Sequence, residues 1–135
     1  MSSVIDIIEG VGEVYARKLH EAGVTTTAEL LQQGATPAGR KELVQKTGIG
    51  DRLILKWVNR ADLFRVKGIG EQYSDLLAAA GVETVLELAQ RRADHLHQKM
   101  VETNEAKKLV RVVPGPEQVA DWVKQAHKLH RVVSY

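Results

Sequence analysis

Apolar residues recur at spacings of three and four along most of this chain, and this spacing places them on one face of a helix. Alternation of apolar and polar residues, which would indicate strands, is confined to short runs such as residues 110–113. We therefore predict an all-α fold. The clearest apolar face belongs to a helix expected after residue 50 and consists of Leu53, Ile54, Trp57, Val58 and Ala61.

Start and stop signals divide this pattern into separate helices. Ser3 is expected to cap a short helix over residues 4–8. Thr36, followed by proline, is expected to begin a helix that runs to about residue 46. A helix over residues 13–22 is expected to end at a glycine and to turn inward Val14, Leu19 and Ala22.

The chain contains an internal repeat. Of the 23 positions from 10 to 32, 12 hold the same residue 58 positions later. The repeated text begins Gly-apolar-Gly-Glu-x-Tyr, continues to Ala-Gly-Val, and includes a Thr-x-x-Glu capping box, in which hydroxyl and carboxylate each accept a backbone N–H. A repeat of this length indicates a small structural unit that is used twice.

A third glycine turn, over residues 48–50, precedes the helix of Trp57, and its counterpart in the second half is degenerate. Trp57 corresponds to Trp122 at an offset of 65, so the second half contains a seven-residue insertion, expected within a helical stretch over residues 94–113. We predict two repeats, 1–61 and 62–135, each with two helix–turn–helix units and packed as one compact body. No Pro/Gly/Ser-rich linker separates them, so the join is expected to be packed or continuous helix.

Composition restricts the functional classes. The 19 basic and 17 acidic side chains leave a net charge of +2, so any polyanion site must be local. The chain has no cysteine, which excludes disulfides and thiolate metal sites. The start of the sequence lacks the pattern of a secretory signal, and no apolar run is long enough to span a bilayer. We therefore expect a cytoplasmic protein with no membrane partner.

The turns of this chain resemble the helix-hairpin-helix motif, in which Gly-apolar-Gly is followed by a helix with a small residue at its fourth position. Residues 8–16, 47–50 and 66–70 carry the resemblance. It implies compact modules of paired hairpins that bind the DNA phosphate backbone without reading sequence. The Tyr-x3-Leu-x2-Ala-Gly-Val continuation is also similar to a bacterial family of uncharacterised tandem helix-hairpin-helix proteins, and this similarity covers nearly the whole chain.

Independently of the resemblance, a glycine turn suits phosphate because its backbone N–H groups can point outward at a helix start. The turn over residues 48–50 has basic residues on both sides, whereas the turn over 68–70 has bases before it and Glu71 after it. Glutamates flank the turn over 10–12, and two prolines in 113–116 make the fourth turn structural only. The predicted contacts are Lys46, Gly48, Ile49, Gly50, Arg52, Lys56, Lys67, Gly68, Ile69 and Gly70, with Gly10, Val11, Gly12, Lys107, Lys108 and Arg111 as weaker candidates.

Two other interpretations remain open. A Gly-x-Gly turn is also the tightest way to join two helices, and a near-neutral helical surface suits a protein partner, so an adaptor or scaffold is the alternative function.

We expect Trp57 and Trp122 to be core residues and Tyr15 and Tyr73 to be half-buried. No motif for catalysis, a cofactor or a small-molecule substrate is present, and no histidine has the partners of a metal site. We predict a non-enzymatic module.

Overall fold

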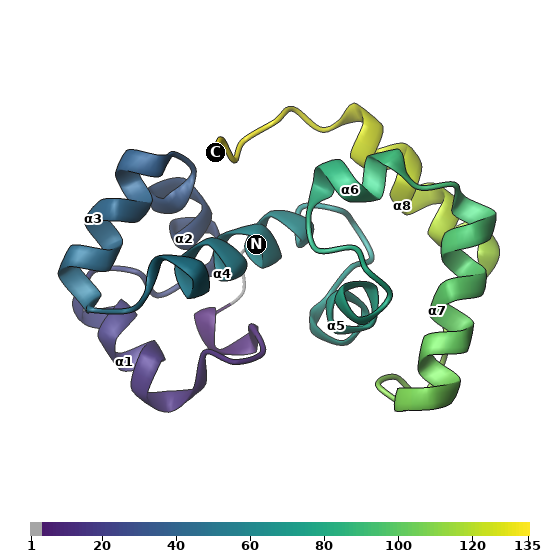
Figure 1. The fold of residues 1–135 in the computed structure, drawn as a ribbon, viewed down its shortest axis with the longest axis horizontal. Helices are drawn as coiled ribbons and strands as arrows, with labels where there is room; N and C mark the ends of the chain where they lie inside the picture. The colour runs from purple at the N-terminus through teal and green to yellow at the C-terminus, as the bar shows by residue number, and fades with distance from the viewer. Residues whose placement is uncertain (1–3) are drawn as a thin grey trace. The chain divides into compact units, whose positions relative to one another are not determined.

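The computed structural model describes residues 4–135 of the chain, which form eight α-helices and one short 3-10 helix joined by loops (Figure 1). Within that part no strand forms, although an isolated bridge pairs Val4 with Thr26. The fold is therefore all-helical, as predicted. In chain order the elements are η1 (Ile5–Ile7), α1 (Gly12–Glu21), α2 (Thr27–Gly34), α3 (Pro37–Thr47), α4 (Asp51–Leu63), α5 (Glu71–Ala79), α6 (Val85–Gln90), α7 (Ala93–Lys107) and α8 (Pro116–Lys128).

Threonine hydroxyls cap three of these helices. Thr26 caps α2 at 3.1 Å from the Glu29 N–H, and the Glu29 carboxylate accepts the Thr26 N–H at 3.0 Å, so the predicted capping box is complete. Thr84 caps α6 in the same way, but the Glu87 carboxylate accepts the N–H of Glu83 rather than that of Thr84. Thr36 caps α3 through the Gly39 N–H at 3.1 Å.

Three local predictions differ from the structure. The helix expected over residues 4–8 is a single 3-10 turn, and the predicted cap at Ser3 lies outside the described residues. Val14 does not face inward but is 65% exposed, because Ala16 and Leu19 form the buried face of α1. The stretch 94–113 is not helical throughout, since α7 ends with Lys108 in a left-handed conformation.

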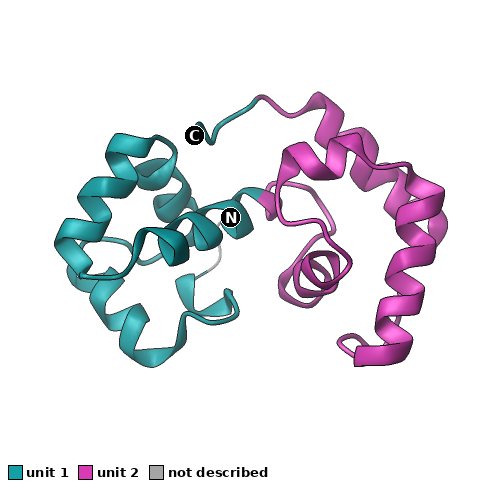
Figure 2. Cartoon of the chain, viewed as in Figure 1, with its two compact units in different colours: residues 1–62, 131–135 teal, residues 63–130 magenta. Residues whose placement is uncertain are grey.

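The chain divides into two compact units (Figure 2). Unit 1 comprises residues 1–62 and 131–135, and unit 2 comprises residues 63–130. The division falls inside α4, which is helical up to Leu63. The final five residues therefore pack with the first unit, although they follow the second in sequence.

Each unit has its own apolar core, with one tryptophan in it. Trp57 is fully buried in unit 1, and Tyr15 packs edge-on against it with ring centroids 5.3 Å apart. In unit 2, Trp122 is 1% exposed and lies 5.3 Å from Tyr73 between centroids. Both tryptophans are core residues and both tyrosines are half-buried, as predicted. These aromatic pairs fix the helix that follows one glycine turn against the last long helix of the same unit.

Candidate nucleic-acid interface

The three glycine turns are tight corners with an exposed rim and a buried centre. The first glycine of each has a positive φ, at 92° in Gly10, 72° in Gly48 and 98° in Gly68. The middle residue points inward, with Val11 and Ile49 1% exposed and Ile69 5% exposed. All six glycines of the corners are exposed. Backbone groups at the helix starts can therefore be reached from solvent.

Two of the helices after these corners begin without a side-chain cap. No side chain caps the N-terminus of α1 or α5, as is also the case for α7 and α8, whereas threonine hydroxyls cap α2, α3 and α6. The first N–H groups of any helix have no acceptor within it. At α1 and α5 these donors therefore face solvent without a side-chain acceptor, which is the arrangement that an anion can use.

The corner over residues 48–50 is fixed by hydrogen bonds that leave its outer edge open. The Gly48 N–H donates to the Val44 carbonyl at 2.8 Å, and the Ile49 N–H donates to the Thr47 hydroxyl oxygen at 3.1 Å. That hydroxyl in turn donates to the Leu43 carbonyl at 2.7 Å. Among the described residues the Gly50 N–H has no acceptor, so it and the first turn of α4 form the available donors.

The basic side chains at the corner over residues 48–50 differ in whether an acidic side chain already pairs with them. Arg52 and Lys56 are exposed and form no ion pair with any described residue. Lys46 is also exposed, but its ammonium group lies 3.0 Å from the Glu42 carboxylate. Asp51 follows the second glycine, as glutamates do at the other two corners. Arg52 and Lys56 are therefore what distinguishes this corner electrostatically.

A groove of about 740 Å³ adjoins the same corner. Its floor is largely apolar, and its cations include two residues of α3 that the sequence analysis did not single out, Arg40 and Lys41. The groove is lined by residues of both α3 and the start of α4, so spacing within either helix carries no signal for it. The lining residues are Pro37, Arg40, Lys41, Val44, Gly50, Asp51, Arg52 and Leu55.

The corner over residues 68–70 is held from α8. The Gln125 side chain accepts the Lys67 N–H at 2.8 Å and donates to the Lys67 carbonyl at 3.0 Å. The Gly68 backbone packs against Trp122, where an added Cβ would lie 2.8 Å from the indole nitrogen. The backbone of Lys67 is therefore engaged, and only its exposed side chain is available to a ligand.

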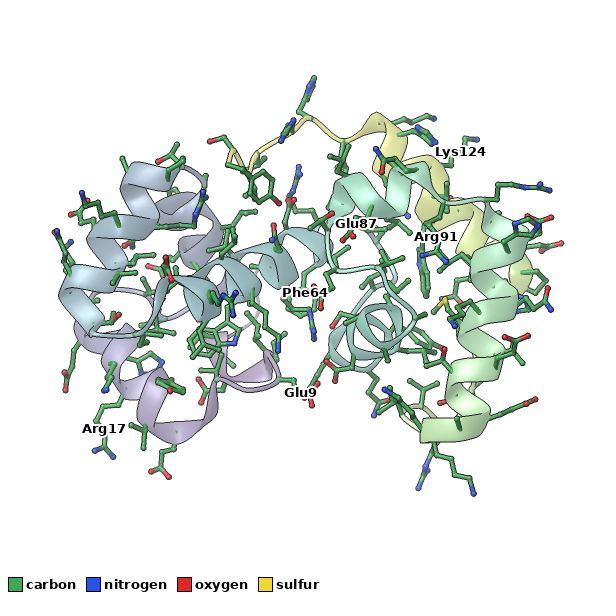
Figure 3. All side chains as sticks on the ribbon, in the orientation of Figure 1. Glu9, Arg17, Phe64, Glu87, Arg91 and Lys124 are labelled. Atoms are coloured by element: carbon green, nitrogen blue, oxygen red, sulfur yellow. The ribbon has the colours of Figure 1, made fainter. Side chains whose placement is uncertain are left out.

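The weaker candidates fall in two separate places. At the corner over residues 10–12, Glu13 lies 3.9 Å from Arg17, whose side chain extends outward from α1 (Figure 3). The basic residues Lys107, Lys108 and Arg111 are exposed in unit 2 and form no ion pair among the described residues.

Asn104 and Tyr73 hold the segment that carries these bases. The Asn104 amide makes two hydrogen bonds to the backbone of Val110, at 2.9 and 3.0 Å. The Tyr73 hydroxyl donates to the Val112 carbonyl at 3.0 Å. The segment is therefore fixed by side chains from α5 and α7, and its lysines extend from a defined backbone.

The fold and these corners define an all-helical protein with exposed glycine hairpins at helix starts. Residues 9–129 match the protein family described as a domain of unknown function (DUF4332), and the chain belongs to this family. Neither the curated proteins nor the solved structures include a match to this chain. Among residues 4–135, no helix has the length and apolar character needed to cross a membrane.

Proposed function

We propose that this protein is a non-enzymatic tandem helix-hairpin-helix module that binds the nucleic-acid backbone, in particular DNA, without sequence preference. The observation that carries the proposal is the corner over residues 48–50. There the Gly50 N–H and the start of α4 lie beside Arg52 and Lys56, neither of which has an acidic partner among the described residues. Backbone donors and unpaired cations at one helix start suit a phosphate diester.

The tandem arrangement is supported by matching contacts in the two units. Gly10 lies near the Trp57 indole nitrogen as Gly68 lies near that of Trp122. In each unit, the tyrosine five residues after this glycine packs on the tryptophan of its own unit, in both cases at 5.3 Å between ring centroids. Such paired contacts are expected if the two halves descend from one repeated unit.

In the proposed complex, the Gly50 N–H and the first N–H groups of α4 donate to a phosphate oxygen, while Arg52 and Lys56 contribute charge. The corner over residues 68–70, with the Lys67 side chain, supplies a second contact. Asp51 and Glu71 oppose both contacts electrostatically. The affinity is therefore expected to be weak and to fall as salt rises, with a log–log slope of about −2 to −3 for two or three phosphate contacts.

The test is binding of a fluorescein-labelled 20-base-pair duplex, followed by anisotropy at salt concentrations from 20 to 200 mM. Arg52→Glu should weaken binding by roughly tenfold or more at low salt and lower the salt slope. Lys124→Glu is the matched control, because it makes the same charge change at an exposed position of α8 that is not among the predicted contacts (Figure 3). No binding at low salt, or equal losses in both variants, would contradict the proposal.

A protein-binding adaptor is the alternative, and the groove beside the same corner favours it. Pro37, Val44 and Leu55 give this groove apolar surface that a phosphate backbone does not need. Purifying the tagged protein with and without nuclease separates the two functions. Proteins retained after nuclease treatment favour the adaptor, and material lost with the nucleic acid favours backbone binding. Sizing of the purified chain then gives its oligomeric state.

A further inference from the structure

The last residues of the chain occupy a defined site on unit 1. The Ser134 N–H donates to the Ala35 carbonyl at 2.8 Å, and the Ser134 carbonyl accepts from the Arg40 guanidinium at 2.7 Å. Val133 is 3% exposed, and the Tyr135 hydroxyl donates to the Asn59 amide oxygen at 2.7 Å. The backbone of Ser134 and the side chain of Tyr135 therefore both contact unit 1, and Val133 is buried.

The receiving surface contains polar groups that are buried by the same contact. Arg40 is 8% exposed and has no carboxylate partner among the described residues; its guanidinium donates to two carbonyls, those of Gly34 and Ser134. Asn59 is 9% exposed. A buried cation and a buried amide are tolerated when hydrogen bonds satisfy them, so removal of the segment would leave both groups short of a partner.

The tyrosine is recognised through its ring as well as its hydroxyl. The guanidinium carbon of Arg40 on the receiving surface lies 5.8 Å from the centroid of the Tyr135 ring, and that of Arg131, within the segment itself, lies at the same distance. Burial of the hydroxyl, which donates to Asn59, raises the pKa of Tyr135, although 58% of the residue remains exposed. The site therefore selects a peptide with a tyrosine next to a backbone that offers both an N–H and a carbonyl.

We propose that this surface is a peptide-binding site whose ligand is the segment 131–135, and that it accepts this segment from a second copy of the chain as well as from its own. The segment follows unit 2, yet apart from the internal contact of Arg131 with Tyr135 every contact described above is made to residues 35–59 of unit 1. His130, which precedes it, and Arg131 and Val132, its first two residues, are exposed. An exposed connection lets the same contacts form within one chain or between two, as in domain swapping. This proposal does not depend on nucleic-acid binding.

The first test uses cysteine pairs in the full-length protein, which has no native cysteine. Ala35→Cys and Ser134→Cys, prepared as separate proteins and mixed under mild oxidation, should form a disulfide-linked heterodimer whose yield increases with concentration. The matched control replaces Ala35→Cys with Arg17→Cys, an exposed residue of α1, and should give several-fold less heterodimer. The double variant in one chain reports the internal contact.

The outcomes separate exchange from a fixed internal contact. An internal disulfide in the double variant without heterodimer in the mixture would overturn the exchange between copies. Equal heterodimer with Ala35→Cys and with Arg17→Cys would show random collision and would also overturn it. Heterodimer specific to Ala35→Cys supports the proposal.

A second test adds the ligand as a free peptide to the full-length protein. A fluorescein-labelled peptide with the sequence of residues 129–135 should show saturable binding by anisotropy. Replacing its tyrosine with phenylalanine should weaken binding several-fold, because the hydrogen bond to Asn59 is lost, and replacement with alanine should weaken it at least tenfold. Since these changes are in the peptide, they leave the protein fold untouched. Equal binding by a scrambled peptide, or no binding at all, would contradict the proposal.

Discussion

Gly68 is constrained by two physical requirements, whereas Gly10 at the equivalent position has one. Both have positive φ, at 98° and 92°. An added Cβ at Gly68 would lie 2.8 Å from the Trp122 indole nitrogen, but one at Gly10 would lie 3.7 Å from that of Trp57, an ordinary contact. The same sequence position thus tolerates a side chain differently in the two units.

Gly68→Ala is accordingly expected to lower the free energy of unfolding more than Gly10→Ala does. Positive φ should cost each variant about 1–2 kcal/mol, and the clash with a buried indole should add about 1–3 kcal/mol at Gly68 alone. Gly50→Ala, where φ is not positive and no atom lies within 4 Å, is the control and should be near neutral. Urea unfolding of the three variants measures this order, and equal losses at Gly10 and Gly68 would refute it.

Among residues 4–135, Lys108 is the one non-glycine residue with a positive φ, at 51°. It follows α7, in a position where glycine is favoured. Lys108→Gly should therefore raise the stability of the protein by about 1 kcal/mol, since the left-handed conformation no longer strains a side chain. Lys107→Gly removes the same charge within the last turn of α7 and should lower stability by about 0.5–1 kcal/mol. Thermal unfolding followed by circular dichroism distinguishes the two, and a lower midpoint for Lys108→Gly would contradict the strain argument.

At the scale of the helix, the local sequence was sufficient to predict interactions between residues no more than four positions apart. The caps at Thr26 and Thr36 follow from the order of residues alone. The contact from Gln125 to the Lys67 backbone does not, because it joins residues 58 positions apart and depends on how α8 packs. The groove beside Gly50 escaped prediction for the same reason.

The capping box of α2 gives a prediction for pH. Hydrogen bonds from the Thr25 side chain and backbone, and then from Thr26, lower the pKa of the Glu29 carboxyl. A lowered folded-state pKa means that the contribution is present above the unfolded-state pKa and is lost as pH falls through the folded-state value. Glu29→Gln should therefore remove part of the acid-induced loss of stability below about pH 4, the ordinary glutamate range.

This effect is measured by urea unfolding at pH 7 and at several values below pH 5. Glu21→Gln, which changes the same group at an exposed position of α1 with no hydrogen bond recorded among the described residues, is the control and should preserve the wild-type pH dependence. If Glu29→Gln kept the full acid dependence, the hydrogen bonds of the box would not be its cause.

At the scale of the whole molecule, the internal sequence repeat predicted two halves but gave no sign that residues 131–135 pack with unit 1. The contacts that place them there are backbone carbonyls and a tyrosine ring, neither of which has a periodic signature. The stability of unit 1 thus depends on residues at both ends of the sequence, whereas unit 2 is made from one continuous stretch.

Because each core holds one tryptophan, the two units can be followed separately by fluorescence. Trp122→Phe leaves Trp57 as the reporter of unit 1, and Trp57→Phe leaves Trp122 as the reporter of unit 2. Adding Leu30→Ala, which truncates a fully buried residue of unit 1, should lower the stability of that unit by about 2–5 kcal/mol. The Trp57 transition should then shift to lower urea by more than the Trp122 transition does. Leu77→Ala, at a fully buried position of unit 2, should give the reverse order. Coincident transitions in both cases would mean that the two cores unfold as one cooperative body rather than as two.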